Sequence, residues 1–585
     1  MIKTLLKSVR EFKFVSIITP ILVFFEVILE CVIPMVIAEM VKLIEKNETI
    51  DMNTVVKYGL AVVVLALLSL AFGTIAGLTA AKASCGFARN VRHDVYYAVQ
   101  DFSFENIDKF STSSLVTRLT TDINNVQMAF MMIIRMAIRS PFMFIFAIVA
   151  AFMTGGKLAW IFVVVVPILA TALIFVASRA MPMFRRVFKK YDNLNASVQE
   201  NIKGMRVVKS FVREDYEKEK FGFASGEVCR DFTRVDRLLA LNNPIMQLCL
   251  NIVMVFVLLI GSRTVVTTLG AELNVAHLSA LLTYGFMILS SLMMLSMVFV
   301  MITMSIESAR RISEVLNEKS TIVSKNNAIT EVSSGSIDFE NVSFKYSKSA
   351  AKYALSDINL HIESGETVGI IGGTGSSKST LVQLISRLYD TTSGAVKVGG
   401  IDVRDYDVEA LRNKVAVVLQ KNVLFSGTIK ENLRWGNEHA TDEQMRHVCS
   451  LAKADEFIDT FPEGYDTYIE QGGANVSGGQ KQRLCIARAL LKEPKVIIFD
   501  DSTSAVDTKT DAHIRKSMRE YIPDTTKIII AQRISSVQDA DKIVVLDGGR
   551  IIAMGNHDEL MNSCEVYRET YESQNKAGGE EDGTK

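Results

Sequence analysis

The sequence predicts an all-α transmembrane domain of six helices with long cytoplasmic helical loops, followed by a mostly parallel α/β domain. Three observations support this fold class. The first 305 residues contain six long apolar segments, and Lys and Arg gather on one side of them. From about residue 334 onward, short apolar runs rich in β-branched residues alternate with helical stretches, which is typical of a parallel sheet.

Composition excludes several other classes of protein. The 585 residues carry 64 basic and 64 acidic side chains, so no net charge favours binding to nucleic acid. The 7 cysteines form no CxxC pair and no Cys/His pair at metal spacing, which argues against a disulfide scaffold and a zinc module. The N-terminal apolar stretch is too long for a secretory signal and lacks a small-residue cleavage site.

Six apolar segments reach the roughly 20 residues that a helix needs to span about 30 Å of hydrocarbon. The predicted spans are 14–40, 57–82, 128–153, 158–178, 244–268 and 278–305. They define a transmembrane domain over residues 1–310, in which the long polar stretches 83–127 and 179–243 join spans on one side. The alternative is a set of buried helices in a large soluble protein, which six such segments with one charge bias disfavour.

The placement of Lys and Arg predicts the orientation in the membrane. Basic residues precede the first span and crowd the loop after the fourth. They are Lys3, Lys7, Arg10 and Lys13, and Arg179, Arg185, Arg186, Lys189, Lys190, Lys203, Arg206, Lys209 and Arg213. The short connections carry far fewer, so we expect both termini and both long loops on the cytoplasmic side of a plasma membrane, in a multi-pass and bacterial protein.

The second domain is expected over residues 334–575, after a charged linker at 311–333. Its first segments read as strands separated by turns at Ser-Gly and Glu-Ser-Gly, and strand-like and helical runs then alternate. The last ten residues, 576–585, are rich in Gly and Glu, and we expect them to be disordered.

A turn rich in glycine and serine follows a short apolar strand that ends at Ile371. The turn and the helix start after it consist of Gly372, Gly373, Thr374, Gly375, Ser376, Ser377, Lys378, Ser379 and Thr380. Phosphates need a concave ring of backbone N–H donors at a positive helix end, and glycines allow close approach. Lys378 would reach the β- and γ-phosphate oxygens, and the Ser379 hydroxyl would ligate Mg²⁺. A plain serine-rich turn is the alternative, because Ser377 stands where this motif expects glycine.

Two further motifs support a site for nucleotide phosphates with Mg²⁺. An apolar strand over residues 496–500 ends in Asp500, whose carboxylate would hold the Mg²⁺ shell. Between the phosphate-binding turn and this strand lies the sequence Ser477, Gly478, Gly479, Gln480, followed by a helical run. The four residues alone are a weak signal, but their position between the other two motifs is specific.

In these motifs the chain resembles the ATP-binding cassette (ABC) transporters, in particular exporter half-transporters with six membrane helices fused to one cassette. The resemblance covers nearly the whole chain and implies an α/β P-loop ATP-binding cassette. It also implies that Tyr346 stacks on adenine, although a core role is the alternative for this residue taken alone. Gln420 would join the Mg²⁺ ligands and link the site to the membrane loops. Ser477–Gly479 would form the signature that caps the γ-phosphate on a partner cassette, and Ser504–Asp507 would form the D-loop.

Two residues depart from the family pattern at its catalytic positions. The family usually has glutamate where Asp501 stands, and a carboxylate misplaced by about 1 Å can cost on the order of 100-fold in rate. The family's switch histidine is replaced by Gln532, which can hydrogen-bond a γ-phosphate but cannot carry the imidazole's charge. Losing a positioned acid–base group costs about 10²–10⁴-fold. We therefore expect slow hydrolysis, or none, of ATP bound to this chain's own P-loop.

This asymmetry predicts a heterodimer with a second half-transporter. The signature keeps nearly the family form, with Val476 in place of leucine, and it acts on the partner's nucleotide. Gln471 stands where many relatives carry glutamate, which agrees with one degenerate and one competent ATP site. Neutral drift in a slow homodimer is the alternative.

Two elements would connect ATP to transport. In relatives, short helices of the long cytoplasmic loops dock on the cassettes, and the matching segments here are 111–118 and 208–216. Phe211 and Tyr216 would provide apolar contacts there, unless they pack only within the loops.

We expect the exported compounds to be hydrophobic or amphipathic, such as drugs or lipids. A peptide exporter and an ATP-gated membrane regulator with little turnover remain alternatives.

Ionisable residues inside a span are costly and are therefore functional candidates. Glu26 and Glu30 lie one turn apart, about 18 and 24 Å into the bilayer at about 1.5 Å per residue. Arg135 and Arg139 of the third span are expected nearer the cytoplasmic side, which argues against a Glu26–Arg139 pair. We expect Glu26 or Glu30 to face the translocation cavity and to favour cationic amphipathic substrates. Structural pairing with the partner chain is the alternative.

Overall fold

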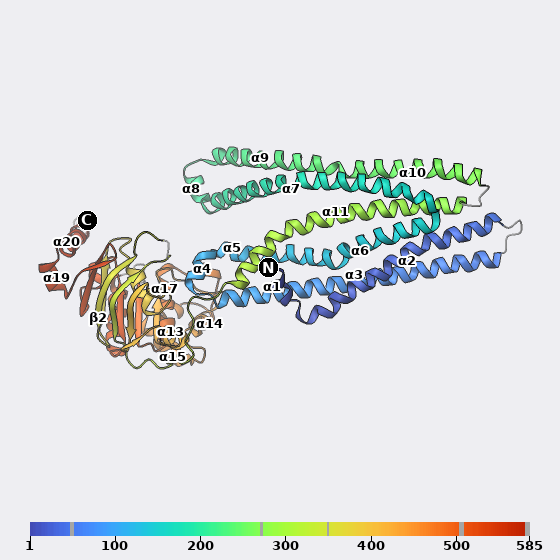
Figure 1. Ribbon diagram of the computed structural model, residues 1–585. Coiled ribbons are helices and arrows are strands. Elements are labelled where there is room, and N and C mark those ends of the chain that lie inside the picture. Colours follow the sequence, from blue (N-terminus) through green and yellow to red (C-terminus); the bar gives the residue numbers. More distant parts are fainter. Residues whose placement is uncertain (47–51, 269–272, 348–349, 502–507, 580–585) are drawn as a thin grey trace. The chain divides into compact units, whose positions relative to one another are not determined.

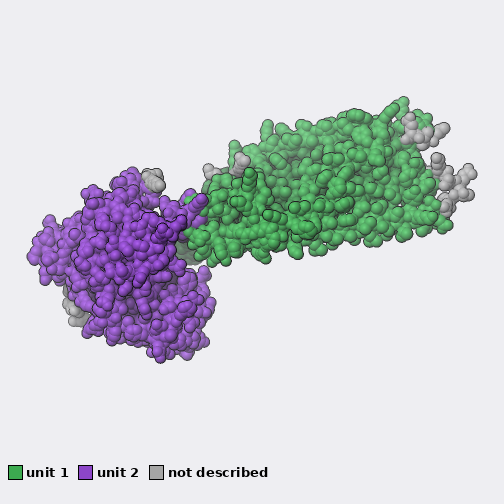
Figure 2. All heavy atoms as spheres, turned by 60° about the horizontal axis from the view of Figure 1, so that its bottom comes forward, with its two compact units in different colours: residues 1–101, 110–318 green, residues 102–109, 319–585 purple. Residues whose placement is uncertain are grey.

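The computed structural model describes residues 1–46, 52–268, 273–347, 350–501 and 508–579. The chain forms two compact units (Figure 2). The first, the membrane unit, contains residues 1–101 and 110–318. The second, the cassette unit, contains residues 319–585 together with the short segment 102–109.

Long helices that run side by side build the membrane unit (Figure 1). Its helices are α1 (Ile2–Lys7), η1 (Arg10–Phe12), α2 (Lys13–Lys46), α3 (Met52–Gln100), α5 (Thr112–Thr117), η2 (Arg118–Asp122), α6 (Ile123–Gly155), η3 (Gly156–Ala159), α7 (Trp160–Lys203), α8 (Met205–Ser210), α9 (Glu214–Ala240), α10 (Asn242–Thr267) and α11 (Val275–Asn317). Several of them extend well beyond a membrane thickness, because the helix-prone polar stretches continue the apolar spans without a break.

Apolar length alone finds five candidate spans among the described residues. These are Arg10–Ile44, Met52–Gln100, Thr112–Phe184, Glu214–Thr267 and Val275–Asn317. The third of them contains both predicted spans 128–153 and 158–178, since α6 and α7 are separated only by the short turn η3. Gly156 allows this turn with a φ of 50°, a left-handed conformation that favours glycine. The membrane unit is thus helical, and the count of six spans stays a prediction.

Small and apolar side chains fill the interior of the membrane unit. The buried set includes Ala147, Ala151, Val253, Tyr284 and Ile288. The Tyr284 hydroxyl donates to the main-chain oxygen of Cys31 at 2.8 Å, so the polar end of this buried ring is satisfied. Other large apolar side chains point outward, such as Leu259 of α10 and Ile174 of α7, at 65% and 68% exposure. Apolar residues on the outer surface suit a unit that lies in a lipid bilayer.

The cassette unit is an α/β domain with two main sheets. The larger sheet has the order β12–β11–β3–β10–β9–β6, parallel except for the edge strand β12, and the smaller antiparallel sheet has the order β2–β1–β4–β5. The strands are β1 (Ile337–Phe344), β2 (Leu355–Ile362), β3 (Thr367–Gly372), β4 (Ser393–Val398), β5 (Ile401–Asp402), β6 (Val415–Val418), β7 (Gly427–Thr428), β8 (Tyr468–Ile469), β9 (Val496–Asp500), β10 (Thr526–Ile530), β11 (Lys542–Asp547) and β12 (Arg550–Gly555).

Helices pack around these sheets. They are α4 (Phe104–Phe110), α12 (Lys378–Ile385), α13 (Val408–Lys414), α14 (Ile429–Arg434), α15 (Asp442–Leu451), α16 (Asp455–Ile458), α17 (Gly478–Leu490), α18 (Thr508–Tyr521), α19 (His557–Ser563) and α20 (Glu565–Gly579), with 3-10 turns η4 (Gly464–Asp466), η5 (Gln471–Gly473) and η6 (Ile534–Ser536). The larger sheet is covered on both faces. In β9, Ile497 and Phe499 face one core while Val496 and Ile498 face the other, as the period of two in a strand requires.

Helices extend into two segments that the sequence predicts to be non-helical, the linker at 311–333 and the tail at 576–585. α11 continues to Asn317, so the first residues of the predicted linker 311–333 are helical, and the change of unit falls between Glu318 and Lys319. α20 ends at Gly579 and therefore includes residues 576–579 of the tail that the composition predicts to be disordered. Residues 580–585 lie outside the described part of the chain.

Candidate functional site

The order of the strands brings the candidate residues together at the carboxyl ends of three neighbouring strands of the larger sheet. β10 lies between β3 and β9, and all three strands run parallel. The phosphate-binding turn follows β3, Asp500 ends β9 and is followed by Asp501, and Gln532 follows β10. Ligands of open α/β sheets bind at the carboxyl ends of parallel strands, so this edge is the candidate ATP site.

The phosphate-binding turn has a tight backbone. A Cβ at Gly372 would lie 2.1 Å from the main-chain oxygen of Leu546, so only glycine fits there. Gly375 has a φ of 84°. Ser377 has a φ of 72° and a ψ of 28°, and it precedes α12 without a side-chain capping bond. A serine thus occupies the left-handed position that suits glycine, which costs about 1–2 kcal/mol. The backbone at Ser377 thus adopts the left-handed conformation that the turn requires, and the serine side chain makes this conformation strained.

Lys378 folds back over the turn. Its Nζ donates to the main-chain oxygens of Gly372 at 2.8 Å and Gly373 at 2.9 Å, and it lies 3.5 Å from Ser376 Oγ. Burial lowers the pKa of this ammonium group, and the nearby Asp501 and Asp500 oppose that shift. The ammonium group of Lys378 therefore lies beside the turn, where it and the backbone N–H groups of the turn can bind phosphate oxygens together.

Two of the three predicted Mg²⁺ ligands are in direct contact. Ser379 Oγ donates to Asp500 Oδ1 at 2.8 Å, and Asp500 is 6% exposed. Burial raises the pKa of the Asp500 carboxyl, against the effect of the Ser379 hydrogen bond. A hydroxyl and a carboxylate oxygen are ligands that Mg²⁺ accepts, with nucleotide phosphates and water completing the shell. The residues therefore fit a Mg²⁺ ion bound together with a nucleotide.

The third predicted ligand, Gln420, bonds to a different carboxylate. Its Nε2 donates to Asp501 Oδ2 at 3.1 Å, and Gln532 Nε2 donates to the same oxygen at 2.6 Å. Asp501 itself has a φ of 48°, and its N–H donates to the main-chain oxygen of Ile530. The three candidate catalytic residues thus form one cluster, in which two amides hold one oxygen of the short carboxylate.

The segment that carries Gln532 has support that the sequence motifs do not indicate. Gln574 of α20 donates through Nε2 to the main-chain oxygen of Gln532 at 2.9 Å, and its Oε1 accepts from the Ile534 N–H at 2.9 Å. A C-terminal helix therefore fixes the backbone next to the candidate γ-phosphate contact. No local motif marks Gln574, because its role depends on how α20 packs.

Tyr346 lies beside the helix that follows the phosphate-binding turn. Its hydroxyl is 2.8 Å from Thr380 Oγ1, and its ring packs edge-on against Phe344 and Tyr389 at 4.9 and 5.2 Å. Burial raises the pKa of the Tyr346 hydroxyl. The residue is nevertheless 46% exposed, which differs from a core tyrosine and leaves ring surface available to a base.

The signature forms the start of α17. Ser477 Oγ accepts from the Gln480 N–H at 3.3 Å, and Gln480 Oε1 accepts from the Ser477 N–H at 2.8 Å. This reciprocal capping box explains the serine and glutamine at their spacing, and it leaves Gly478 and Gly479 in the first turn. The positive end of a helix attracts phosphate. Val476 is buried in the core, an apolar role that leucine would also fill, and Gln471 begins η5.

The predicted D-loop, Ser504–Asp507, lies outside the described residues. Of the predicted docking segments, 111–118 falls in the membrane unit, whereas the preceding residues 102–109 belong to the cassette unit. The segment 208–216 contains the end of α8 and the start of α9. Phe211 directly follows α8 and is 73% exposed, and Tyr216 lies in α9 and is 59% exposed, so neither side chain is packed within the loop.

The expected separation of Glu26 and Arg139 is wrong. Arg139 donates through Nη1 to Glu26 and through Nη2 to both oxygens of Glu30 at 2.8 Å. α2 and α6 pack together, and the two residues lie almost equally far into their predicted spans, 14–40 and 128–153. Their side chains therefore meet at one depth, and the carboxylates pair within this chain.

The two glutamates have different surroundings. Glu26 is 5% exposed, and a Cβ at Gly73 would lie 2.8 Å from its Oε1, so it packs against α3. Glu30 lines a cavity of about 280 Å³ between α2 and α11, whose other walls include Ile37, Ala276 and Met287. Of the two glutamates, Glu30 rather than Glu26 lines this cavity.

Comparisons with known proteins define the class. Residues 16–293 match the family model of the ABC transporter transmembrane region, and residues 355–504 match the model of the ABC transporter ATP-binding region, described as "ABC transporter". The chain belongs to the ABC transporters and carries a membrane region and an ATP-binding region in one polypeptide. Because this family couples ATP hydrolysis to transport, the chain is part of an ATP-dependent transporter.

Particular relatives extend over nearly the whole chain. It is 34% identical over 569 residues to the "Uncharacterized ABC transporter ATP-binding protein YfiB" of Bacillus subtilis (strain 168), which covers 97% of this chain and 98% of that protein. It is 34% identical over 529 residues to the protein Rv1273c of Mycobacterium tuberculosis (strain ATCC 25618 / H37Rv), with 90% of each covered. A solved structure of a bacterial Atm1-family ABC exporter with ATP bound has a TM-score of 0.82 at 23% identity, covering 96% of this chain and 97% of that one, and therefore shares its fold.

Proposed function

We propose that this chain is one subunit of a heterodimeric ABC exporter, and that its own ATP site is degenerate. The observation that carries the proposal is the cluster at Asp501. An aspartate stands at the position of the family's general base, and the amides of Gln420 and Gln532 hold its Oδ2. Neither amide can accept or donate a proton in place of the family's histidine. The cluster supports ATP binding and slow ATP cleavage at this site.

The remaining residues of the site support tight nucleotide binding. The backbone of the phosphate-binding turn and Lys378 would hold the phosphates, and Tyr346 would stack on adenine. Ser379 and Asp500 would hold Mg²⁺, which supplies charge neutralisation of the phosphates. Such a site favours closure of two cassettes around ATP without requiring its hydrolysis at each cycle.

The signature of this chain would act on its partner. Ser477, Gly478 and Gly479 form a capped positive helix end that fits the γ-phosphate of a nucleotide bound to a second half-transporter. A partner with glutamate and histidine at the positions of Asp501 and Gln532 would then form one competent site with this chain. The proposed domains are 1–310 for the membrane domain and 334–575 for the cassette.

We propose hydrophobic or amphipathic compounds as the exported substrates. The cavity beside Glu30 has apolar walls on α2 and α11, which suits an apolar body. The carboxylates of Glu26 and Glu30 share one guanidinium, that of Arg139, so the group retains acidic character on the cavity side. The Lys and Arg distribution supports cytoplasmic termini and a cytoplasmic cassette at a plasma membrane.

Purification from the native membrane tests the heterodimer. A tagged copy of this chain, expressed at its natural level, is solubilised in mild detergent, and the co-purifying proteins are identified by mass spectrometry. The proposal predicts an equimolar second half-transporter that carries glutamate and histidine at the two catalytic positions. Recovery of this chain as a homodimer alone would favour the slow homodimer if its ATPase activity is low, and a conventional symmetric exporter if that activity is full.

A further inference from the structure

The segment that follows β10 leaves the regular ladder of the larger sheet. Its last ladder contact is the Ala531 N–H, which donates to the main-chain oxygen of Ile370 at 3.2 Å. Beyond this point, the main-chain oxygen of Gln532 and the N–H of Ile534 have one partner among the contacts of the described residues, the side-chain amide of Gln574. A segment with few hydrogen bonds opens easily. The position of Gln532 therefore depends on a residue of another element, α20.

The amide of Gln574 takes the place of a neighbouring strand. Its Nε2 donates to the Gln532 oxygen and its Oε1 accepts from the Ile534 N–H, both at 2.9 Å. Arg533 between them is extended, with a φ of −99° and a ψ of 129°. An acceptor and a donor on one side of an extended chain are the groups that a β-ladder satisfies. Glutamine supplies the matching donor and acceptor from one side chain.

Two tyrosines set the orientation of α20. Tyr567, Tyr571 and Gln574 follow the spacing i, i+4 and i+7, which places them on one face of the helix. Tyr567 is 1% exposed, and its hydroxyl lies 2.8 Å from His557 Nδ1. The ring of Tyr571 packs edge-on against His557, with centroids 5.1 Å apart. The face that anchors α20 in the cassette is thus the face that carries Gln574.

The side chain of Gln532 has a donor to spare. Its Nε2 carries two N–H groups, and one of them donates to Asp501 Oδ2 at 2.6 Å. The second N–H is available to an oxygen of the γ-phosphate, a group that ATP has and ADP lacks. A hydrogen bond of this kind needs a donor–acceptor distance of about 2.7–3.2 Å. The backbone of Gln532 must therefore be held in place if this N–H is to distinguish the two nucleotides.

We propose that Gln574 is a positioning residue that makes the preference of this site for ATP over ADP depend on α20. Its amide fixes the Gln532 backbone, and the Gln532 amide then donates to the γ-phosphate. This role rests on the proposed contact of Gln532 with the nucleotide, and it does not depend on whether the site hydrolyses ATP. A purely structural role for Gln574 would change the affinities for both nucleotides equally, or stability alone.

Nucleotide affinities of the full-length chain in nanodiscs test this role. Titration calorimetry measures the dissociation constants of the Mg²⁺ complexes of ADP and of AMP-PNP, a non-hydrolysable ATP analogue. Gln574→Met keeps an unbranched side chain that suits a helix but removes both amide bonds. A hydrogen bond to a charged group corresponds to about a tenfold change in affinity. We expect Gln574→Met to weaken AMP-PNP binding about tenfold and ADP binding less than about twofold.

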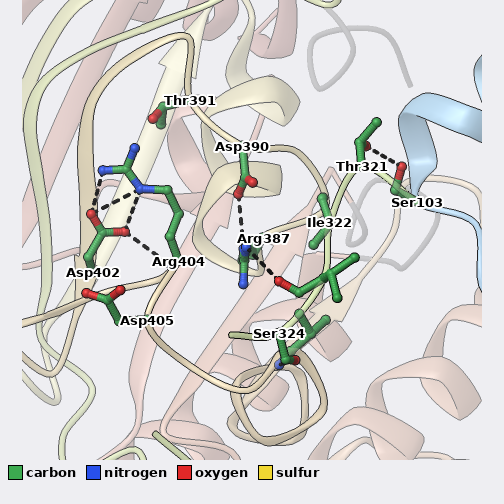
Figure 3. A network of polar contacts seen from close by, with 12 residues as sticks. Ser103, Thr321, Ile322, Ser324, Arg387, Asp390, Thr391, Asp402, Arg404 and Asp405 are labelled. Atoms are coloured by element: carbon green, nitrogen blue, oxygen red, sulfur yellow. Dashed lines mark hydrogen bonds and ion pairs between the residues drawn. The ribbon is translucent and has the colours of Figure 1, made fainter. Parts of the chain in front are cut away.

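Two further variants accompany this measurement. Gln532→Met removes the phosphate contact directly and should reproduce the selective loss. Arg404→Met is the matched control, because Arg404 also bonds through its side chain, to Asp402 Oδ2 at 2.6 Å (Figure 3) and to the main-chain oxygen of Gly394 at 3.4 Å. This variant removes polar contacts of the cassette unit that do not involve α20, and it should leave the preference for AMP-PNP unchanged.

The outcomes separate this inference from the proposed function. If Gln574→Met keeps the preference while Gln532→Met loses it, the inference is wrong and the phosphate contact of Gln532 stands. If Gln532→Met also keeps it, the proposed contact of Gln532 fails, and the role of Gln574 fails with it. Equal weakening of both nucleotides in Gln574→Met, or the same selective loss in Arg404→Met, would also overturn the inference.

Discussion

Gln532 donates a hydrogen bond of 2.6 Å to Asp501, and we propose that both residues stand at positions where the ABC family carries the groups that it uses for proton transfer. The contact explains how the two departures fit together. A shorter carboxylate and a neutral amide satisfy each other, and Gln420 adds a second donor to the same oxygen at 3.1 Å. The site is therefore ordered without the catalytic pair, which fits a binding role for this nucleotide pocket.

Restoring both catalytic groups should raise ATP cleavage at this site. We expect Asp501→Glu combined with Gln532→His to increase the ATPase rate of the purified chain on the order of 100-fold. The glutamate side chain is one methylene longer and extends further toward the nucleotide, and the histidine can take part in proton transfer. Steady-state phosphate release measures the rate. The matched control, Asp539→Glu with Gln538→His, introduces the same residue types at exposed positions. An equal rise in the control, or none in the first variant, contradicts this interpretation.

The strained backbone at Ser377 predicts a stabilising substitution. Its φ of 72° favours glycine, and its side chain makes no capping bond. Ser377→Gly should therefore be more stable than Ser377→Ala by about 1 kcal/mol, since only alanine keeps the Cβ that clashes in this conformation. Thermal unfolding of the nucleotide-free protein measures the difference. Equal stability of the two variants would show that the turn carries no strain at this residue.

Removing Arg139 should destabilise the membrane unit. The guanidinium pairs with Glu26 and Glu30, and its loss leaves two carboxylates without their partner. We expect Arg139→Met to cost about 3 kcal/mol, measured by thermal unfolding in detergent, because a buried charge without its partner is strongly unfavourable. Arg263→Met on α10 is the control, since this side chain is exposed. Adding Glu26→Gln and Glu30→Gln should recover most of the loss. A stable Arg139→Met protein would exclude the pairing.

The buried Asp500 predicts a pH-dependent gain of stability. Burial raises the pKa of this carboxyl above its ordinary value of 3.8, so the ionised form is disfavoured in the folded protein. The associated stability is present below the unfolded pKa and is lost as pH rises through the folded pKa. Asp500→Asn should therefore raise the unfolding temperature at pH 7 without nucleotide, and the gain should disappear toward about pH 4. A gain that is independent of pH would contradict this cause.

Local motifs in the sequence predict most of the cassette site. The turn after β3, the carboxylates after β9 and the capped signature each depend on residues close in sequence, and parallel strand order brings the first two together. The contacts of Gln574 could not be predicted in this way, because they depend on the packing of α20. The Glu26–Arg139 contact was excluded by assigning different depths to α2 and α6, although the two side chains meet at one depth in the helix pair.

The ATPase activity of the chain purified without any partner tests the central claim most directly. The account predicts that this preparation binds ATP with Mg²⁺ but hydrolyses it very slowly, and that Asp501→Asn leaves the low rate nearly unchanged. Addition of a half-transporter with a complete catalytic pair should then produce rapid hydrolysis. Rapid hydrolysis by the chain alone, abolished by Asp501→Asn, would contradict a degenerate site and with it the heterodimer.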